Sequence, residues 1–125
     1  YENMAQTLGI QAITPELPDW TCKIQVVDIC KLGESKERKI KYLNMIFQDE
    51  QEHQIKAIVY GDDIPVYQDI FKLFHTYLIT SSRIQQSNLR FDKPLHTFSW
   101  IIDKKTIIDL VDKDDPDEHQ LPPPT

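Results

Sequence analysis

Two runs of alternating apolar residues, joined by a polar segment, constrain the fold of this chain more than any other feature. Within residues 42–47, and again within residues 55–60, apolar side chains recur at every second position. Because alternate residues of a strand point to opposite faces, this spacing predicts two strands with one buried face. The acidic segment between them predicts the turn of a β-hairpin. The residues assigned to the buried face are Leu43, Met45, Phe47, Ile55, Ala57 and Val59.

The opposite face of the predicted hairpin combines basic, aromatic and polar side chains. Lys56 and Tyr60 share this face with Ile58, and Tyr42 and Asn44 lie on the same side of the first strand. Aromatic rings stack on nucleobases, and lysine neutralises phosphate. This face is therefore a candidate surface for nucleic acid.

The net charge of −6 argues against nucleic acid until it is located along the chain. Residues 109–118 hold six acidic side chains against Lys113, so the rest of the chain carries about −1. Residues 31–41 are basic, with five cations, including Lys36 and Arg38, against two acidic side chains. This segment is either a nucleic-acid contact or a solvated hairpin tip.

Length and composition favour one folded domain with irregular ends. A chain of 125 residues with 40% hydrophobic residues has room for one compact core. We expect an extended lead-in over residues 1–19, a folded domain over 20–111, and an acidic, proline-rich disordered tail or linker over 112–125. The sequence lacks a membrane-spanning apolar run and a secretory-signal pattern, which favours a soluble intracellular protein without a membrane partner, with Met4 as a candidate native start.

The sequence gives little support to a metal site or to catalysis. Cys22 and Cys30 share the parity of the apolar residues on one predicted strand, so we expect both in the core, too far apart for a disulfide. The four histidines lack metal-ligand spacing, and the three glycines form no phosphate-binding loop. We expect no metal, no cofactor, no catalytic residue and no enzyme activity.

The whole chain predicts five strands and one helix. The first strand covers about residues 20–29, and Gly33-Glu34-Ser35 marks the turn into the second. Asp62-Asp63 and Pro65 predict the start of a helix whose apolar face includes Phe71 and Phe74 as a plug for the core. The fourth strand covers residues 77–84. The fifth alternates through Phe98, Trp100 and Ile102, with an extension through residues 106–108 as an alternative, and its parity places Trp100 in the core.

Three strands, a helix and two strands are the order of the OB-fold, an all-β, five-stranded Greek-key barrel with one helix between strands three and four. Four segments resemble the DNA-binding OB domains of the large subunit of replication protein A, and among these the plant members in particular. They are Trp20-Thr21, Asp49-Glu50, Ile55-Lys56-Ala57 with Tyr60, and Tyr77 through Asn88-Leu89-Arg90-Phe91. The resemblance extends over about residues 20–108.

The resemblance implies roles for several residues. It implies that Tyr60, at the end of strand three, and Phe91, between strands four and five, stack on bases, and that Lys56 contacts the nucleic acid strand. Asn88 and Arg90 are the polar groups beside the second aromatic. The alternatives are that Tyr60 closes the barrel rim and that Phe91 anchors its loop on the barrel.

Two positions depart from the family pattern: Gln85 replaces a lysine on strand four, and Ser99 replaces an acidic base-contacting residue on strand five. The resemblance implies a nuclear single-stranded DNA-binding module for replication or repair, working with other OB domains or subunits of a replication protein A-like complex. RNA stays possible, because stacking and phosphate contacts do not discriminate the 2′-hydroxyl. The alternative, favoured by the acidic net charge, is an OB domain that binds other proteins.

Overall fold

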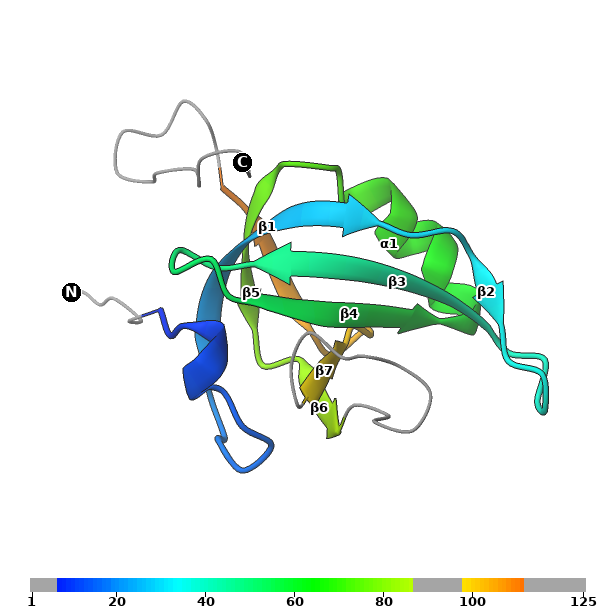
Figure 1. Ribbon diagram of the computed structural model, residues 1–125, viewed down its shortest axis with the longest axis horizontal. Helices are drawn as coiled ribbons and strands as arrows, with labels where there is room; N and C mark the ends of the chain where they lie inside the picture. Colours follow the sequence, from blue (N-terminus) through cyan, green and yellow to red (C-terminus); the bar gives the residue numbers. More distant parts are fainter. Residues whose placement is uncertain (1–6, 87–97, 112–125) are drawn as a thin grey trace.

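The computed structural model describes residues 7–86 and 98–111, which form a strongly curled sheet with one α-helix at its end (Figure 1). Two single-turn 3-10 helices, η1 and η2, precede β1 and α1. In chain order the elements are η1 (Ile10–Ala12), β1 (Thr21–Ile29), β2 (Gly33–Glu34), β3 (Lys41–Gln48), β4 (Gln54–Tyr60), η2 (Gly61–Asp63), α1 (Ile64–Ile70), β5 (Thr76–Thr80), β6 (Arg83–Gln86), β7 (Phe98–Ile101) and β8 (Ile107–Leu110).

The predicted hairpin is confirmed as β3 and β4. The two strands pair over their whole length, from Tyr42 opposite Tyr60 to Gln48 opposite Gln54. The buried Asp49 holds the turn, because its Oδ1 accepts hydrogen bonds from the backbone N–H groups of Gln51 and His53, both at 2.9 Å. A carboxylate that accepts several N–H groups satisfies donors that a tight turn would otherwise leave unpaired.

The pairing of the remaining strands closes the sheet into a barrel. β1 lies between β3 and β5, and β4 pairs in parallel with β7. β6 pairs with β7, and β5 pairs with β8. Because β5–β6 and β7–β8 are each two halves of one predicted strand, these pairings join the two edges of the sheet. The result is the all-β, five-stranded Greek-key OB-fold that the sequence predicts, with α1 between β4 and β5.

Both of the last two predicted strands are interrupted, which the sequence analysis did not predict. The fourth breaks between β5 and β6, where Ser81 adopts a left-handed backbone with φ of 56°. The fifth breaks at a turn closed by a hydrogen bond from the Thr106 N–H to the Asp103 carbonyl at 3.0 Å. At the other end of the barrel, Gly33 and Glu34 form β2 against β3, so the chain reverses after this pair, beyond the predicted turn.

The helix is shorter than predicted, and Phe74 is not part of the core plug. α1 ends at Ile70, and Phe71 follows it into the core, where its ring centroid lies 5.4 Å from that of Phe47. Phe74 has φ of 66° and is 48% exposed. Helical spacing cannot place a residue beyond the helix end, so the prediction was correct for Phe71 and wrong for Phe74.

Cys30 does not lie in the core, because β1 contains a β-bulge. The β1–β3 register shifts between Val26 and Asp28. One extra residue reverses the alternation of every later side chain. Cys22, before the bulge, is buried as predicted, whereas Cys30 is only half-buried and follows the parity of Asp28.

Side chains that precede β1 complete the core. The expected extended lead-in is interrupted by η1, and Ile10 and Ile13 pack in the core cluster. The Ile10 N–H donates to Asp49 Oδ2 at 2.8 Å, which ties this segment to the β3–β4 turn. Trp100 is fully buried, as its parity predicted, with its ring centroid 4.8 Å from that of Trp20.

Candidate nucleic-acid interface

The candidate interface is the outer sheet face, the side of β3, β4, β6 and β7 that points away from the core (Figure 1). Its residues alternate with core residues along each strand and pair with one another across strands. They are Tyr42, Asn44, Ile46, Lys56, Ile58, Tyr60, Arg83, Gln85, Ser99 and Ile101.

Cross-strand pairing arranges these residues in rows. One row runs from Ile46 through Lys56 and Ser99 to Gln85. The next row begins at Asn44 and ends at Arg83, with the buried side chains of Ile58 and Ile101 between them. The first row thus places Lys56 beside the apolar Ile46, and the second row ends in the cation of Arg83. The surface therefore offers positive charge to phosphates.

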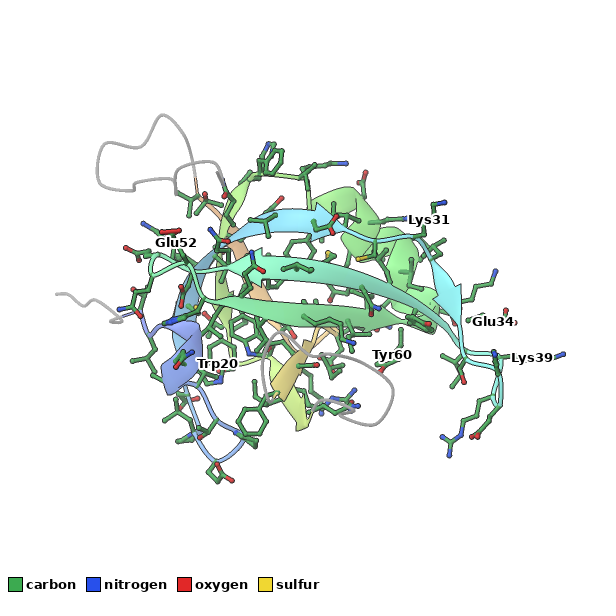
Figure 2. All side chains as sticks on the ribbon, viewed as in Figure 1. Trp20, Lys31, Glu34, Lys39, Glu52 and Tyr60 are labelled. Atoms are coloured by element: carbon green, nitrogen blue, oxygen red, sulfur yellow. The ribbon has the colours of Figure 1, made fainter. Side chains whose placement is uncertain are left out.

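Two tyrosines face each other at one end of this surface. Tyr42 and Tyr60 are directly paired across β3 and β4, and Tyr60 is 37% exposed (Figure 2). The ring of Tyr42 lies over Gly33, where any Cβ atom would overlap it. The absence of a side chain at Gly33 therefore leaves the space that the Tyr42 ring occupies.

The electrostatic environment of Tyr60 identifies its neighbours. Burial raises the pKa of the Tyr60 phenol, the Tyr42 phenol raises it further, and the Arg83 guanidinium lowers it. The net direction is upward, so Tyr60 is neutral at physiological pH and presents an uncharged ring. Arg83 and Tyr42 are thus the charged and aromatic groups that accompany Tyr60 on the outer sheet face.

Charges of both signs border the Lys56 row. Asp28 pairs with Ile46 across β1 and β3, and Cys30 follows on the same side of the chain. Burial raises the pKa of the Cys30 thiol, Asp28 raises it further, and Lys56 lowers it. The register agrees, because Asp28 lies in the same row as Lys56. The Cys30 N–H donates to the Asn44 carbonyl of the next row, which places a free thiol at the border of the outer sheet face.

Asn44 stands between the two ends of the surface. Its amide oxygen is buried and meets no hydrogen-bond donor among the described residues. Its backbone carbonyl accepts from the Cys30 N–H at 2.9 Å, which holds β1 and β3 together here. The side chain of Asn44 thus has hydrogen-bonding capacity that the described part of the protein leaves unused.

The basic residues Lys36 and Arg38 lie in the turn between β2 and β3, and both are exposed. Backbone hydrogen bonds between Ser35 and both Ile40 and Lys39 close this turn. Figure 2 shows the turn projecting beyond the barrel at the end of β4 where Tyr60 lies, with Lys39 at its base. These cations extend from the Tyr42–Tyr60 end of the surface.

The structure does not place every predicted site residue. Asn88, Arg90 and Phe91 lie outside the described residues, so their predicted roles stay untested. Gln85 is exposed on the outer sheet face, whereas Ser99, its partner across β6 and β7, is buried.

Arg83 was missed by the sequence analysis, which assigned it no role. It lies on the outer sheet face at the start of β6, and its side chain is 64% exposed. The predicted fourth strand runs without interruption through Ser81, so it does not indicate that β6 begins at Arg83. The alternation of Arg83 with the core residue Ile84 was the one available signal.

Neither a metal centre nor a membrane segment is found in the described ranges. No group of three histidine, cysteine, aspartate or glutamate side chains there could hold a metal ion. The only α-helix described is too short to cross a membrane.

Two solved structures of replication protein A share the fold of this chain. A chain of a replication protein A heterotrimer bound to single-stranded DNA matches with a TM-score of 0.72 and 18% identity, over 92% of this chain and 27% of that chain. DNA-binding domain A of S. cerevisiae replication protein A matches with a TM-score of 0.64 and 20% identity, over 87% of this chain and 96% of that domain. No protein-family model and no curated protein matches the sequence. At these identities the similarity establishes the OB-fold, and the present chain spans about a quarter of the heterotrimer chain.

Proposed function

We propose that this protein is a sequence-tolerant, single-stranded DNA-binding OB module. The observation that supports this function best is the direct pairing of Tyr42 and Tyr60 on the outer sheet face, which also carries the cations Lys56 and Arg83. The fold is shared with DNA-binding domain A of replication protein A and with a chain of a replication protein A heterotrimer bound to single-stranded DNA.

Base stacking would supply most of the affinity in this proposal. Every base has an apolar π-face, so an aromatic platform binds it without reading sequence, at about 1–3 kcal/mol per base. Tyr60 provides an exposed, uncharged ring, and Tyr42 provides a second ring fixed over Gly33. Two adjacent platforms suit two consecutive bases of a single strand, whereas the paired bases of a duplex are not free to stack on them.

Ionic contacts would position the strand. Lys56 lies in the middle of the surface, and Lys36 and Arg38 extend from the end where the tyrosines lie. Neutralising phosphates releases counterions and makes binding weaker as salt increases. Asn88, Arg90 and Phe91 complete the proposed site as the resemblance implies, and Gln85 adds an uncharged polar contact.

We further infer that this protein is a member of the replication protein A large-subunit family, close to its plant members. We propose that it acts in the nucleus, in replication or repair, beside other OB domains or subunits. A single OB domain covers few nucleotides, so avidity from neighbouring domains would raise the affinity of the assembly. Titration with oligo-rU of the same length as the oligo-dT would show whether RNA competes with DNA for this site.

A second candidate function is protein binding, and one observation favours it. Exposed apolar side chains cluster on α1 and the segment after it, a part of the barrel distinct from the outer sheet face. They are Val66, Ile70, Leu73 and Phe74. Exposed apolar groups of this kind often mark partner surfaces, so one molecule could use both faces.

Titration of a labelled oligo-dT at two salt concentrations tests the proposed function. We expect binding at low salt that weakens as salt increases, because ionic contacts accompany stacking. Absence of binding at low salt would leave protein binding as the better account.

Alkylation of Cys30 gives an independent footprint of the same surface. Cys30 is a half-buried free thiol at the border of the outer sheet face, whereas Cys22 is fully buried and burial raises its pKa strongly. A maleimide should therefore modify Cys30 first, and bound oligo-dT should slow that reaction. An unchanged rate under saturating oligo-dT would place the strand elsewhere on the protein.

A further inference from the structure

Arg83 lies where an oligonucleotide on the outer sheet face would pass. It pairs with Ile101 across β6 and β7, and Ile101 pairs with Ile58 across β7 and β4. Ile58 precedes Tyr60 by two residues on the same side of β4, so Arg83 lies one row from the proposed stacking platform. The influence of its guanidinium on the Tyr60 phenol agrees with this proximity.

Among the described residues, the ionic partner of Arg83 is Asp103, and the contact is loose. Arg83 Nε lies 3.9 Å from Asp103 Oδ2, which is too long for a hydrogen bond. The Arg83 side chain is 64% exposed, against 30% for Asp103. An exposed ion pair of this geometry contributes little to stability, so the guanidinium can leave it at small cost.

Asp103 is held far more firmly than Arg83. Its carbonyl accepts from the Tyr67 hydroxyl at 2.7 Å, and its Oδ1 accepts from the Lys105 N–H at 3.0 Å. Its own N–H donates to Thr106 Oγ1 at 3.2 Å. These contacts hold Asp103 in place, with its Oδ2 facing the exposed guanidinium of Arg83.

We propose that Arg83 binds a backbone phosphate of the single strand on the outer sheet face, and that Asp103 competes with this phosphate for the guanidinium. This inference rests on the proposed function. A guanidinium is always charged and its planar donors match two phosphate oxygens, so a phosphate makes hydrogen bonds that Asp103 does not make at 3.9 Å. Asp103 then lowers the affinity for the strand by part-neutralising Arg83 in the free protein.

The two substitutions that test the pair preserve the fold. Arg83→Gln removes the charge from an exposed side chain. Asp103→Asn is isosteric and keeps Oδ1 as the acceptor for Lys105, so the turn survives while the charge facing Arg83 is lost. Lys72→Gln is the matched control, because Lys72 is an exposed cation with an acidic neighbour, Asp69, at 3.8 Å, outside the outer sheet face.

The experiment is a labelled oligo-dT titration of wild type, both single variants, the double variant and the control, each at low and high salt, with melting temperatures. Arg83→Gln should weaken binding at low salt by roughly two- to fivefold, the range of an exposed ion pair. Its plot of log affinity against log salt should be shallower by about 0.7. The single variant Asp103→Asn should bind oligo-dT more tightly than wild type does. The double variant should bind about as Arg83→Gln does, because the cation that Asp103 faces is gone.

Three other results would contradict the Arg83 contact, the competition with Asp103, or the proposed function itself. If Arg83→Gln binds like Lys72→Gln while wild type binds oligo-dT, Arg83 is not a contact, and the proposed function stands without it. If Asp103→Asn strengthens binding equally with and without Arg83, the substitution acts only through the net charge of the protein. Competition between Asp103 and the phosphate for Arg83 is then refuted. If folded wild type does not bind oligo-dT, both the proposed function and this inference fail.

Discussion

At the scale of single residues, side-chain parity separates the aromatic rings of this protein into two roles. Trp100 alternates with outward-facing residues of β7 and is fully buried, whereas Tyr60 ends β4 on the outward side and is partly exposed. Parity predicted both positions correctly. Parity failed for Cys30, because a β-bulge reverses the alternation. Helical spacing failed for Phe74, because the helix ends at Ile70. The sequence alone marks neither feature.

Substitution of Trp100 should affect folding and not the outer sheet face directly. Trp100→Ala should cost about 3–5 kcal/mol of unfolding free energy, through lost burial and the cavity that remains. Trp100→Phe should cost less, because the indole N–H that it removes meets no acceptor among the described residues. Denaturant unfolding measures both. An alanine variant as stable as wild type would show that Trp100 is not in the core.

Lys56 should contribute one ionic contact to binding. Lys56→Ala should weaken oligo-dT binding at low salt and reduce the salt slope by about 0.7, because one fewer counterion is released. Lys72→Ala, which removes a cation outside the outer sheet face, is the control and should leave the slope unchanged. An unaltered slope for Lys56→Ala would remove this residue from the site.

At the scale of elements, the sequence predicted the β3–β4 hairpin well and the later strands less well. The hairpin has a strict two-residue period bounded by a polar turn, and local pattern suffices to define it. The breaks between β5 and β6, and between β7 and β8, depend on how each half must turn to pair with a different neighbour as the barrel closes. That requirement is non-local. The same break gives Arg83 its position, which is why a local pattern missed it.

The contact between β2 and β3 should control the second aromatic platform. Gly33→Ala should displace the far end of the Tyr42 ring, since a Cβ atom would overlap it. If Tyr42 stacks on a base, this variant should lose up to about 1–3 kcal/mol of oligo-dT binding. Tyr42→Ala should lose a similar amount, and the double variant should lose no more than Tyr42→Ala alone. Additive losses would indicate that Gly33 acts through something other than Tyr42.

At the scale of the whole molecule, charge is unevenly distributed between the barrel and the C-terminal segment. The net charge is −6, and residues 109–118 hold six of the 20 acidic residues. Residues 109–110 lie in β8, and the rest of this segment follows β8 and extends beyond the described range. A local excess of negative charge repels nucleic acid over distances set by ionic strength, so its effect should be greatest at low salt.

Deletion of residues 112–125 should raise the affinity for oligo-dT at low salt. The gain should disappear as salt increases, because screening removes the repulsion. Replacing the acidic residues of the same segment by their amides is the matched control for charge, and should reproduce the gain without shortening the chain. We expect the melting temperature to stay nearly unchanged. A large drop would show that the predicted domain boundary at residue 111 is wrong.

The central claim is that Tyr60 stacks on a base of a single strand, and paired measurements on two variants test it most directly. Tyr60→Phe keeps the ring and should bind oligo-dT almost as wild type does. Tyr60→Ala should lose about 1–3 kcal/mol of binding with little change in melting temperature, because the ring is on the solvent side of the barrel. A Tyr60→Ala protein that melts early yet binds normally when folded would contradict the claim, and would assign Tyr60 to closing the barrel rim.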